Sequence, residues 1–165
     1  MKRYVKNVLI YLAALFGIVA FLTIFSSPLK IYDSIKDTWY NYPVRTYLGK
    51  SSQNINVYKG AVMPIFGFVL PLIMSIVLIV ESFQPSWSKS IAVLNTVLAV
   101  IYFICAIFVL LTKELFLSVN SLGDYLYVKN GGGPIASAIL STLAGIVLLF
   151  VSWCPSDKDI DFIEK

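Results

Sequence analysis

The sequence contains no histidine, which removes the commonest general base and the commonest metal ligand of proteins. Its two cysteines, Cys105 and Cys154, do not form a C-x-x-C pair, so the usual parts of a thiol–disulfide or zinc site are missing. We interpret both cysteines as small apolar residues. The sequence therefore predicts a protein that is not an enzyme, binds no cofactor or metal, and has no catalytic side chain.

Charge is also scarce, since 13% of the 165 residues are charged and 58% are hydrophobic. Soluble domains carry about 25% charged residues, so both values favour a protein surrounded by lipid. The 13 Lys and Arg residues are spread along the chain and form no basic arm, which argues against nucleic-acid binding. The length is typical of one domain, and we expect residues 1–165 to form it.

Four long apolar runs contain no Asp, Glu, Lys or Arg. A helix needs about 20 apolar residues to cross the hydrocarbon core of a bilayer, where the backbone must satisfy its own hydrogen bonds. The sequence therefore predicts an all-α membrane protein, a bundle of four transmembrane helices. The predicted spans are residues 8–25, 60–80, 91–112 and 134–153.

A signal peptide is the alternative interpretation of the first run, because a basic segment precedes it. We favour an uncleaved anchor, because the run is longer than a usual signal-peptide core and Ser-Ser-Pro at 26–28 is a poor cleavage site. The 13 basic residues divide almost evenly between the two sides of the membrane and do not orient the chain. The basic N-terminal segment favours a multi-pass protein of the cell membrane with both termini in the cytoplasm.

In this topology the two longer loops, residues 26–59 and 113–133, share the outer face. A short amphipathic helix is expected at about residues 29–42, because apolar side chains recur there at helical spacing. It would lie in the membrane interface, cap the bundle or bind a partner. Its apolar face would contain Ile31, Ile35, Trp39 and Tyr42.

Other parts of these loops have the chemistry of strands. VRTYL (44–48) and NINVY (54–58) flank a polar, turn-like stretch, which predicts a small β hairpin. DYLYV (124–128) has a similar pattern, so a small outer sheet built from both loops is a further hypothesis. Tyr125 and Tyr127 are candidates for partner contacts, because Tyr and Trp are enriched at protein interfaces.

The fourth run carries small residues at every fourth position, a pattern that lets helix backbones approach closely in lipid. We expect this stripe to face another helix, either of this chain or of a second subunit, rather than lipid. The first run has a shorter version in Ala13 and Gly17. The residues of the stripe are Gly133, Ser137, Ser141 and Gly145.

An amide side chain, Asn95, lies near the start of the third run. An amide in lipid usually bonds to a neighbouring helix, and a substrate site is the alternative interpretation. Glu81 follows the second run directly, and we expect its carboxylate to be solvated. Because no acid or base lies within any predicted span, a proton-coupled transporter is disfavoured.

The last third of the chain contains Gly123, Leu126-Tyr127, the small-residue fourth helix and Cys154-Pro155, and the loops follow the order long, short and intermediate. In these features the chain resembles the claudin-type four-span proteins. The resemblance implies a four-span bundle with a role in barriers or adhesion. The first loop has Trp39 but lacks the Gly-Leu-Trp motif and paired cysteines of that family, so no functional residue is transferred.

Together these features predict a non-enzymatic integral membrane protein that acts as an accessory subunit, assembly factor or adhesion component. Its partners would be the lipid bilayer and another membrane protein, or a second copy of itself. An oligomeric pore or small-molecule transporter with an uncharged pathway past Asn95 is one alternative. A membrane redox component is another, which the missing histidine and C-x-x-C pair disfavour.

Overall fold

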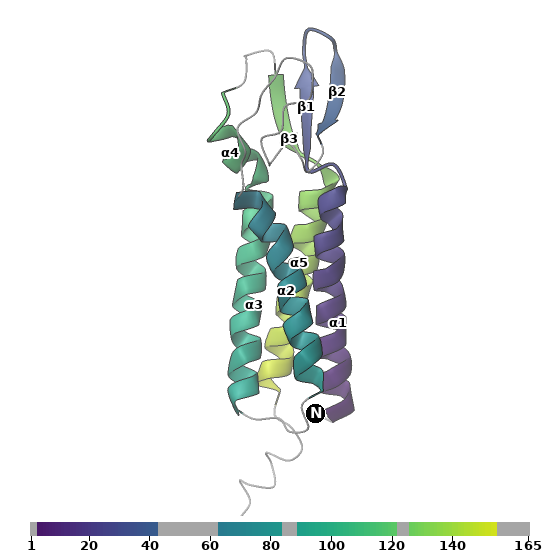
Figure 1. The fold of residues 1–165 in the computed structure, drawn as a ribbon, viewed down its shortest axis with the longest axis vertical. Coiled ribbons are helices and arrows are strands. Elements are labelled where there is room, and N and C mark those ends of the chain that lie inside the picture. Colours follow the sequence, from purple (N-terminus) through teal and green to yellow (C-terminus); the bar gives the residue numbers. More distant parts are fainter. Residues whose placement is uncertain (1–2, 43–62, 84–88, 122–125, 155–165) are drawn as a thin grey trace, which may run out of the picture.

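The computed structural model describes residues 3–42, 63–83, 89–121 and 126–154. These residues form a bundle of four long helices with a small sheet beyond one end (Figure 1). We call that end the sheet end, and the opposite end, where the first helix begins and the last one ends, the terminal end. The four helices are α1 (Arg3–Leu22), α2 (Met63–Ser82), α3 (Lys89–Leu110) and α5 (Gly132–Trp153).

Within the described residues, four helices are long and apolar enough to cross a membrane. They agree with the four predicted spans to within a few residues at each end, and residues 60–62 of the second predicted span lie outside the described residues. A chain with four such helices fits a multi-pass membrane protein. The helical segments are Tyr4–Phe25, Met63–Ser82, Ser90–Leu110 and Gly132–Trp153.

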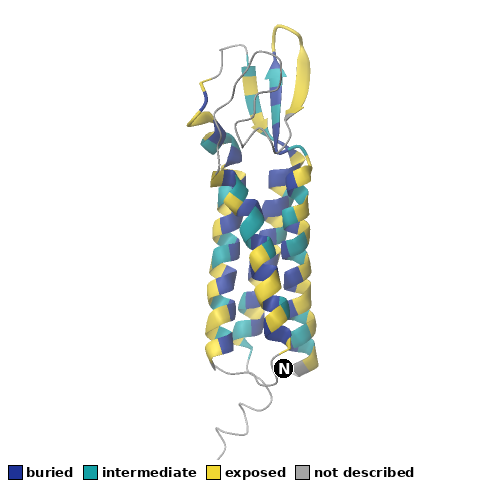
Figure 2. Ribbon diagram, viewed as in Figure 1, coloured by how far each residue is buried: buried dark blue, intermediate teal, exposed yellow. Residues whose placement is uncertain are grey.

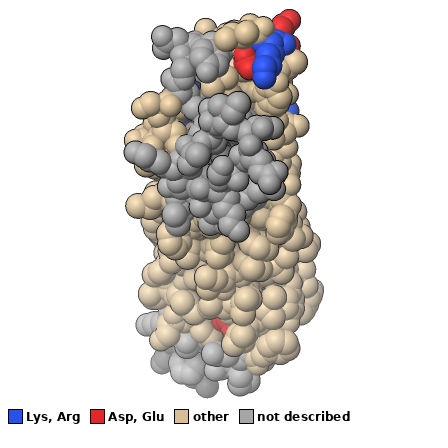
Figure 3. Space-filling model, turned by 45° about the horizontal axis from the view of Figure 1, so that its top comes forward, with Lys and Arg blue, Asp and Glu red and all other residues tan. Residues whose placement is uncertain are grey.

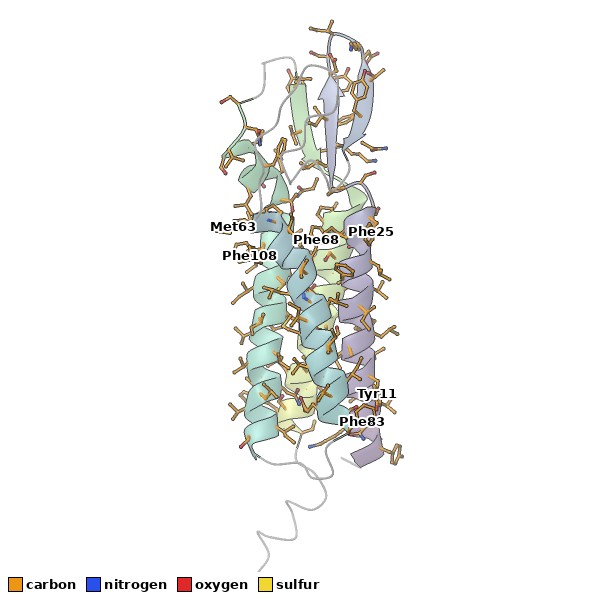
Figure 4. The ribbon with its side chains drawn as sticks, in the orientation of Figure 1. Tyr11, Phe25, Met63, Phe68, Phe83 and Phe108 are labelled. Carbon is orange, nitrogen blue, oxygen red and sulfur yellow. The ribbon has the colours of Figure 1, made fainter. Side chains whose placement is uncertain are left out.

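Each long helix buries one side in the bundle and exposes the other, as the alternating colours of Figure 2 show. Figure 4 shows apolar side chains extending outward along the length of all four helices. An apolar surface of this extent suits contact with lipid and is rare on soluble proteins. The largest fully buried side chains of the bundle include Tyr102, Phe68, Ile10, Leu78 and Leu148.

The predicted amphipathic helix at residues 29–42 is wrong. These residues form two antiparallel strands, β1 (Leu29–Asp33) and β2 (Thr38–Tyr42). The alternation of LKIYD and the β-branched and aromatic residues of TWYNY favour strands. The helical spacing of four apolar residues competes here with the period of two in β1, and the structure follows the period of two.

The turn between the two strands depends on aspartate. Oδ1 of Asp33 accepts hydrogen bonds from the backbone N–H groups of Ile35 (3.0 Å) and Lys36 (3.2 Å). Asp37 has a φ of 50°, a left-handed conformation that aspartate tolerates better than most residues. An aspartate side chain that bonds the backbone in this way competes with helix formation and favours a turn between the two strands.

A third strand, β3 (Leu126–Asn130), comes from the later loop and pairs antiparallel with β1. The described residues thus form a three-stranded sheet in the order β2-β1-β3, with strands from both loops. The hairpin predicted from residues 44–48 and 54–58 lies outside the described residues. Of the predicted strand at 124–128, residues 126–128 lie in β3, which continues to Asn130, and residues 124–125 lie outside the described residues.

A short helix and one asparagine attach the sheet to the bundle. α4 (Thr112–Leu117) follows the end of α3. Nδ2 of Asn130 donates to the carbonyl of Leu110 (2.7 Å), and Oδ1 of Asn130 accepts from the N–H of Lys113 (3.0 Å). One side chain thereby satisfies backbone groups at the end of α3 and at the start of α4. A buried apolar cluster beneath the sheet contains Leu29, Ile31 and Phe116.

Candidate functional site

The face of the sheet that points away from this buried cluster carries aromatic side chains. The register places Tyr32 opposite Trp39 of β2 on one side and opposite Tyr127 of β3 on the other. The ring centroid of Tyr32 lies 5.1 Å from that of Trp39 and 6.3 Å from that of Tyr127. Nζ of Lys129 lies 3.8 Å from the centroid of the Trp39 ring. We call these four residues the aromatic face.

Strand periodicity explains how this face forms. Along β1, Leu29 and Ile31 point into the buried cluster, so the residues between them point outward. Cross-strand aromatic pairs stabilise a sheet by about 0.2–1 kcal/mol each, and a cation above an aromatic ring adds about 0.5–1 kcal/mol at an exposed site. The aromatic face is therefore ordered by its own contacts while it stays accessible.

The hydroxyl of Tyr32 donates a hydrogen bond to Oδ1 of Asp37 at 2.5 Å. This bond favours the neutral phenol and raises the pKa of Tyr32 above its ordinary value. Partial desolvation and the negative charges of Asp37 and Asp33 raise the pKa further. The contact joins the aromatic face to the turn of the hairpin.

Replacing Asp37 by asparagine should lower the pKa of Tyr32, because the carboxylate that opposes ionisation of the phenol is removed. Spectrophotometric titration of tyrosinate absorbance measures this shift, and subtraction of the Tyr32→Phe titration isolates the contribution of Tyr32. If Tyr32 titrates at the same pH in the wild type and in Asp37→Asn, the hydrogen bond does not form in solution.

The first-loop residues that were expected on one apolar face lie in different environments. Ile31 is buried under the sheet, Ile35 is 75% exposed at the turn, and Trp39 belongs to the aromatic face. The side chain of Tyr42 and all of Tyr125 lie outside the described residues. Tyr127 belongs to the aromatic face. The sequence alone did not indicate Tyr32 or Lys129, because these two residues become neighbours of the other aromatic residues only when the strands pair.

The small-residue stripe of α5 lies against other helices of the same chain. Ser137 and Ser141 are fully buried, and Gly133 lies against the backbone just after α1. A Cβ on Gly145 would lie 3.0 Å from the ring of Phe103 in α3. The stripe thus contributes close packing within one chain.

The shorter stripe of α1 lies beside a polar cluster in the middle of the bundle. Ala13 is fully buried, and a Cβ on Gly17 would clash with the hydroxyls of Ser75 and Tyr102. The Ser75 hydroxyl donates to the carbonyl of Pro71 (2.7 Å) and lies 3.1 Å from the Tyr102 hydroxyl. Gly17 therefore makes room for hydrogen bonds that join α2 to α3.

Asn95 is fully buried, and its Nδ2 donates to Oε1 of Glu81 at 2.8 Å. The expectation of a solvated Glu81 is wrong, because α2 continues past Glu81 to Ser82 and the side chain is only 6% exposed. Oε2 of Glu81 and Oδ1 of Asn95 are also buried, and neither has a hydrogen-bond partner. An acid and an amide thus meet between α2 and α3 near the terminal end.

Neither cysteine is in a disulfide; Cys105 is buried in the bundle, and Cys154 lies just after α5. Within the described part of the chain, no group of three His, Cys, Asp or Glu side chains lies close enough to hold a metal ion. A scan of family models and searches of curated proteins and of solved structures found no match to this chain. The resemblance to claudin-type proteins therefore stays a prediction, and function is argued from the geometry.

Proposed function

We propose that this is a non-enzymatic membrane protein that binds a second membrane protein through the aromatic face of its sheet. It would act as an accessory subunit, an assembly factor or an adhesion component. The observation that carries the proposal is the exposure of the aromatic face, where Trp39 is 49% and Tyr127 59% exposed. Trp and Tyr dominate the binding energy of many protein interfaces, and these two are held by a sheet anchored to the bundle.

The position of the sheet favours a protein partner over lipid. It lies beyond the end of the four apolar helices, so the bilayer would not cover it (Figure 1). In Figure 3 the visible Lys and Arg side chains of the described residues, and most of the acidic ones, lie at this end, whereas the described surface along the helices is almost entirely tan. We infer that the aromatic face contacts the extramembrane part of a partner.

The charges on the sheet indicate the chemistry of that partner. The register places Lys30 beside Lys129, so two cations share the side of the sheet that carries the aromatic rings. A complementary surface would combine apolar side chains with carboxylates, because opposite charges steer association and exclude wrong partners. We therefore propose an acidic, partly apolar patch on the partner.

We propose further that the sheet end faces the outside of the cell membrane. α1 begins and α5 ends at the terminal end, so both helix ends lie on one side of a bilayer (Figure 1). The basic residues before and within the start of α1 favour the cytoplasm for that side.

A pore through a single chain is the less favoured function. The interior of the bundle is occupied by large side chains such as Phe68, Tyr102 and Leu148, each fully buried. Conduction would then require a passage between several copies of the chain. Binding requires only the surface that the fold already exposes.

Replacing Trp39 and Tyr127 together by alanine should release the partner. Truncation of an interface hot spot costs about 2 kcal/mol or more, which is about 30-fold in Kd. A photo-crosslinking amino acid at Asn41, which is exposed two residues after Trp39 on the same side of β2, identifies the contact when it is used in intact cells and followed by purification in mild detergent and mass spectrometry. We expect one membrane-protein adduct whose complex is lost in the double variant.

The matched control is a crosslinker at Ile146, which is 52% exposed on the apolar side of α5. It should not give the same adduct, and Ile146→Ala should keep the complex. A pure homo-oligomer that conducts ions in liposomes would contradict the proposal in favour of the pore.

A further inference from the structure

We propose that Glu81 and Asn95 form a binding site for a single proton between α2 and α3, near the terminal end of the bundle. Figure 4 labels Tyr11 of α1 and Phe83, which directly follows α2, near this end of the bundle, and Tyr11 is hydrogen-bonded to Ser82, the neighbour of Glu81. The inference does not depend on the proposed binding function, because no residue of the aromatic face takes part.

The argument starts from a shortage of hydrogen-bond donors. An ionised Glu81 has two acceptor oxygens, and Oδ1 of Asn95 is a third acceptor. The only hydrogen bond among these groups is the one that Asn95 donates to Oε1 of Glu81. Oε2 and Oδ1 would then be left without donors, and a buried charge that lacks a partner is strongly unfavourable.

A proton on Oε2 corrects both defects. It removes the negative charge. It also supplies an O–H donor, and Oδ1 of Asn95 is the acceptor in the site that still has no hydrogen-bond partner. A carboxylic acid has one O–H donor beside its carbonyl acceptor, and a carboxamide has N–H donors beside its own carbonyl, so the two groups can exchange two hydrogen bonds. When the proton leaves to water, a carboxylate remains between the two helices.

The neighbouring titratable groups at this level come from two other elements. α1 contributes Lys6, which is 4% exposed and has interactions of its own, and Tyr11, whose hydroxyl accepts a hydrogen bond from Ser82 (2.8 Å). Cys154 follows the end of α5. Oε2 of Glu81 is buried and has no hydrogen-bond partner, so a proton is the simplest ligand that would neutralise the carboxylate.

Loss of the proton would weaken the contact between α2 and α3. The neutral pair joins the two helices through polar bonds in apolar surroundings, whereas a carboxylate would draw water between them. The site thus makes the packing of the terminal end depend on pH. No local pattern of residues indicates this site, because the carboxyl lies just beyond an uncharged run.

Infrared spectroscopy of the intact protein in lipid nanodiscs tests the site directly. The wild type at neutral pH should show the C=O band of a protonated carboxylic acid, and the band should disappear as the pH is raised. It should be absent from Glu81→Gln and kept in Glu114→Gln, which changes a carboxyl at the sheet end. A wild-type spectrum without this band at neutral pH overturns the proposal.

Thermal unfolding gives a second, independent measurement. A glutamine at position 81 offers the same donor and acceptor as the protonated acid, so Glu81→Gln should keep the wild-type midpoint at neutral pH. A lowered midpoint would mean that the carboxylate itself is needed, which overturns the proposal. If Na⁺ or K⁺ raises the midpoint of the wild type but not that of Glu81→Gln, the site binds a metal cation and not a proton, which overturns the proposal.

Discussion

Replacing Gly17 by alanine should destabilise the protein, although alanine is the better helix former. Helix propensity alone predicts a gain of about 1 kcal/mol from this change. The added Cβ would meet the hydroxyls of Ser75 and Tyr102, and it would lie 2.9 Å from the carbonyl of Pro71. Overpacking of this kind costs about 1–3 kcal/mol, and each broken hydrogen bond adds about 1 kcal/mol. Thermal unfolding in mild detergent measures the net loss.

The control for this prediction is Gly132→Ala, because a Cβ on Gly132 has no neighbour within 4 Å. This variant should keep the wild-type midpoint. Adding Ser75→Ala to Gly17→Ala should recover part of the loss, since it removes one of the clashing oxygens. Equal midpoints for Gly17→Ala and Gly132→Ala would show that α1 does not approach α2 and α3 this closely.

Replacing Ser141 by leucine should have a similarly large effect on the packing of α5. Ser141 is fully buried at the centre of the stripe, and leucine adds a branched side chain where helices approach closely. We expect a loss of about 3 kcal/mol, at the upper end of the usual cost of overpacking. The thermal midpoint of the detergent-purified chain measures it, and Ile139→Leu, at a position that is 56% exposed, should change little.

The outcome for Ser141→Leu also separates two roles of the stripe. A less stable single chain means that the stripe packs within the bundle. A chain of unchanged stability that no longer holds its partner means that the stripe faces a second subunit. If Ser141→Leu alters neither stability nor association, the stripe faces lipid in the membrane and the packing described above is wrong.

The pattern of four spans was fully present in the sequence. An uncharged run of about 20 residues crosses lipid as a helix, because only a helix satisfies its backbone hydrogen bonds within the segment. The small residues of α5 were visible as well, since a spacing of four places them along one side of a helix. The sequence alone does not show whether the helix that packs against this stripe belongs to the same chain or to a second subunit.

The loops show where local patterns fail. Residues 29–42 carry a helical spacing and a strand alternation at once, so the sequence alone did not decide between them. Pairing of β1 with β3 decided for strands, and this contact spans about a hundred residues of chain. The aromatic face follows from that pairing, because Tyr32, Trp39 and Tyr127 become neighbours only when three strands are in register.

Glu81 is the sharpest example of what only the tertiary structure decided. A carboxyl at the end of an apolar run is normally solvated, and nothing near Glu81 in the sequence indicates otherwise. Asn95 follows 14 residues later, and the antiparallel packing of α2 and α3 brings its amide to 2.8 Å from the carboxyl. Composition and periodicity determine which segments cross the membrane, because these depend on local burial. Which polar groups meet between the helices depends on how the helices pack, and that is a property of the whole fold.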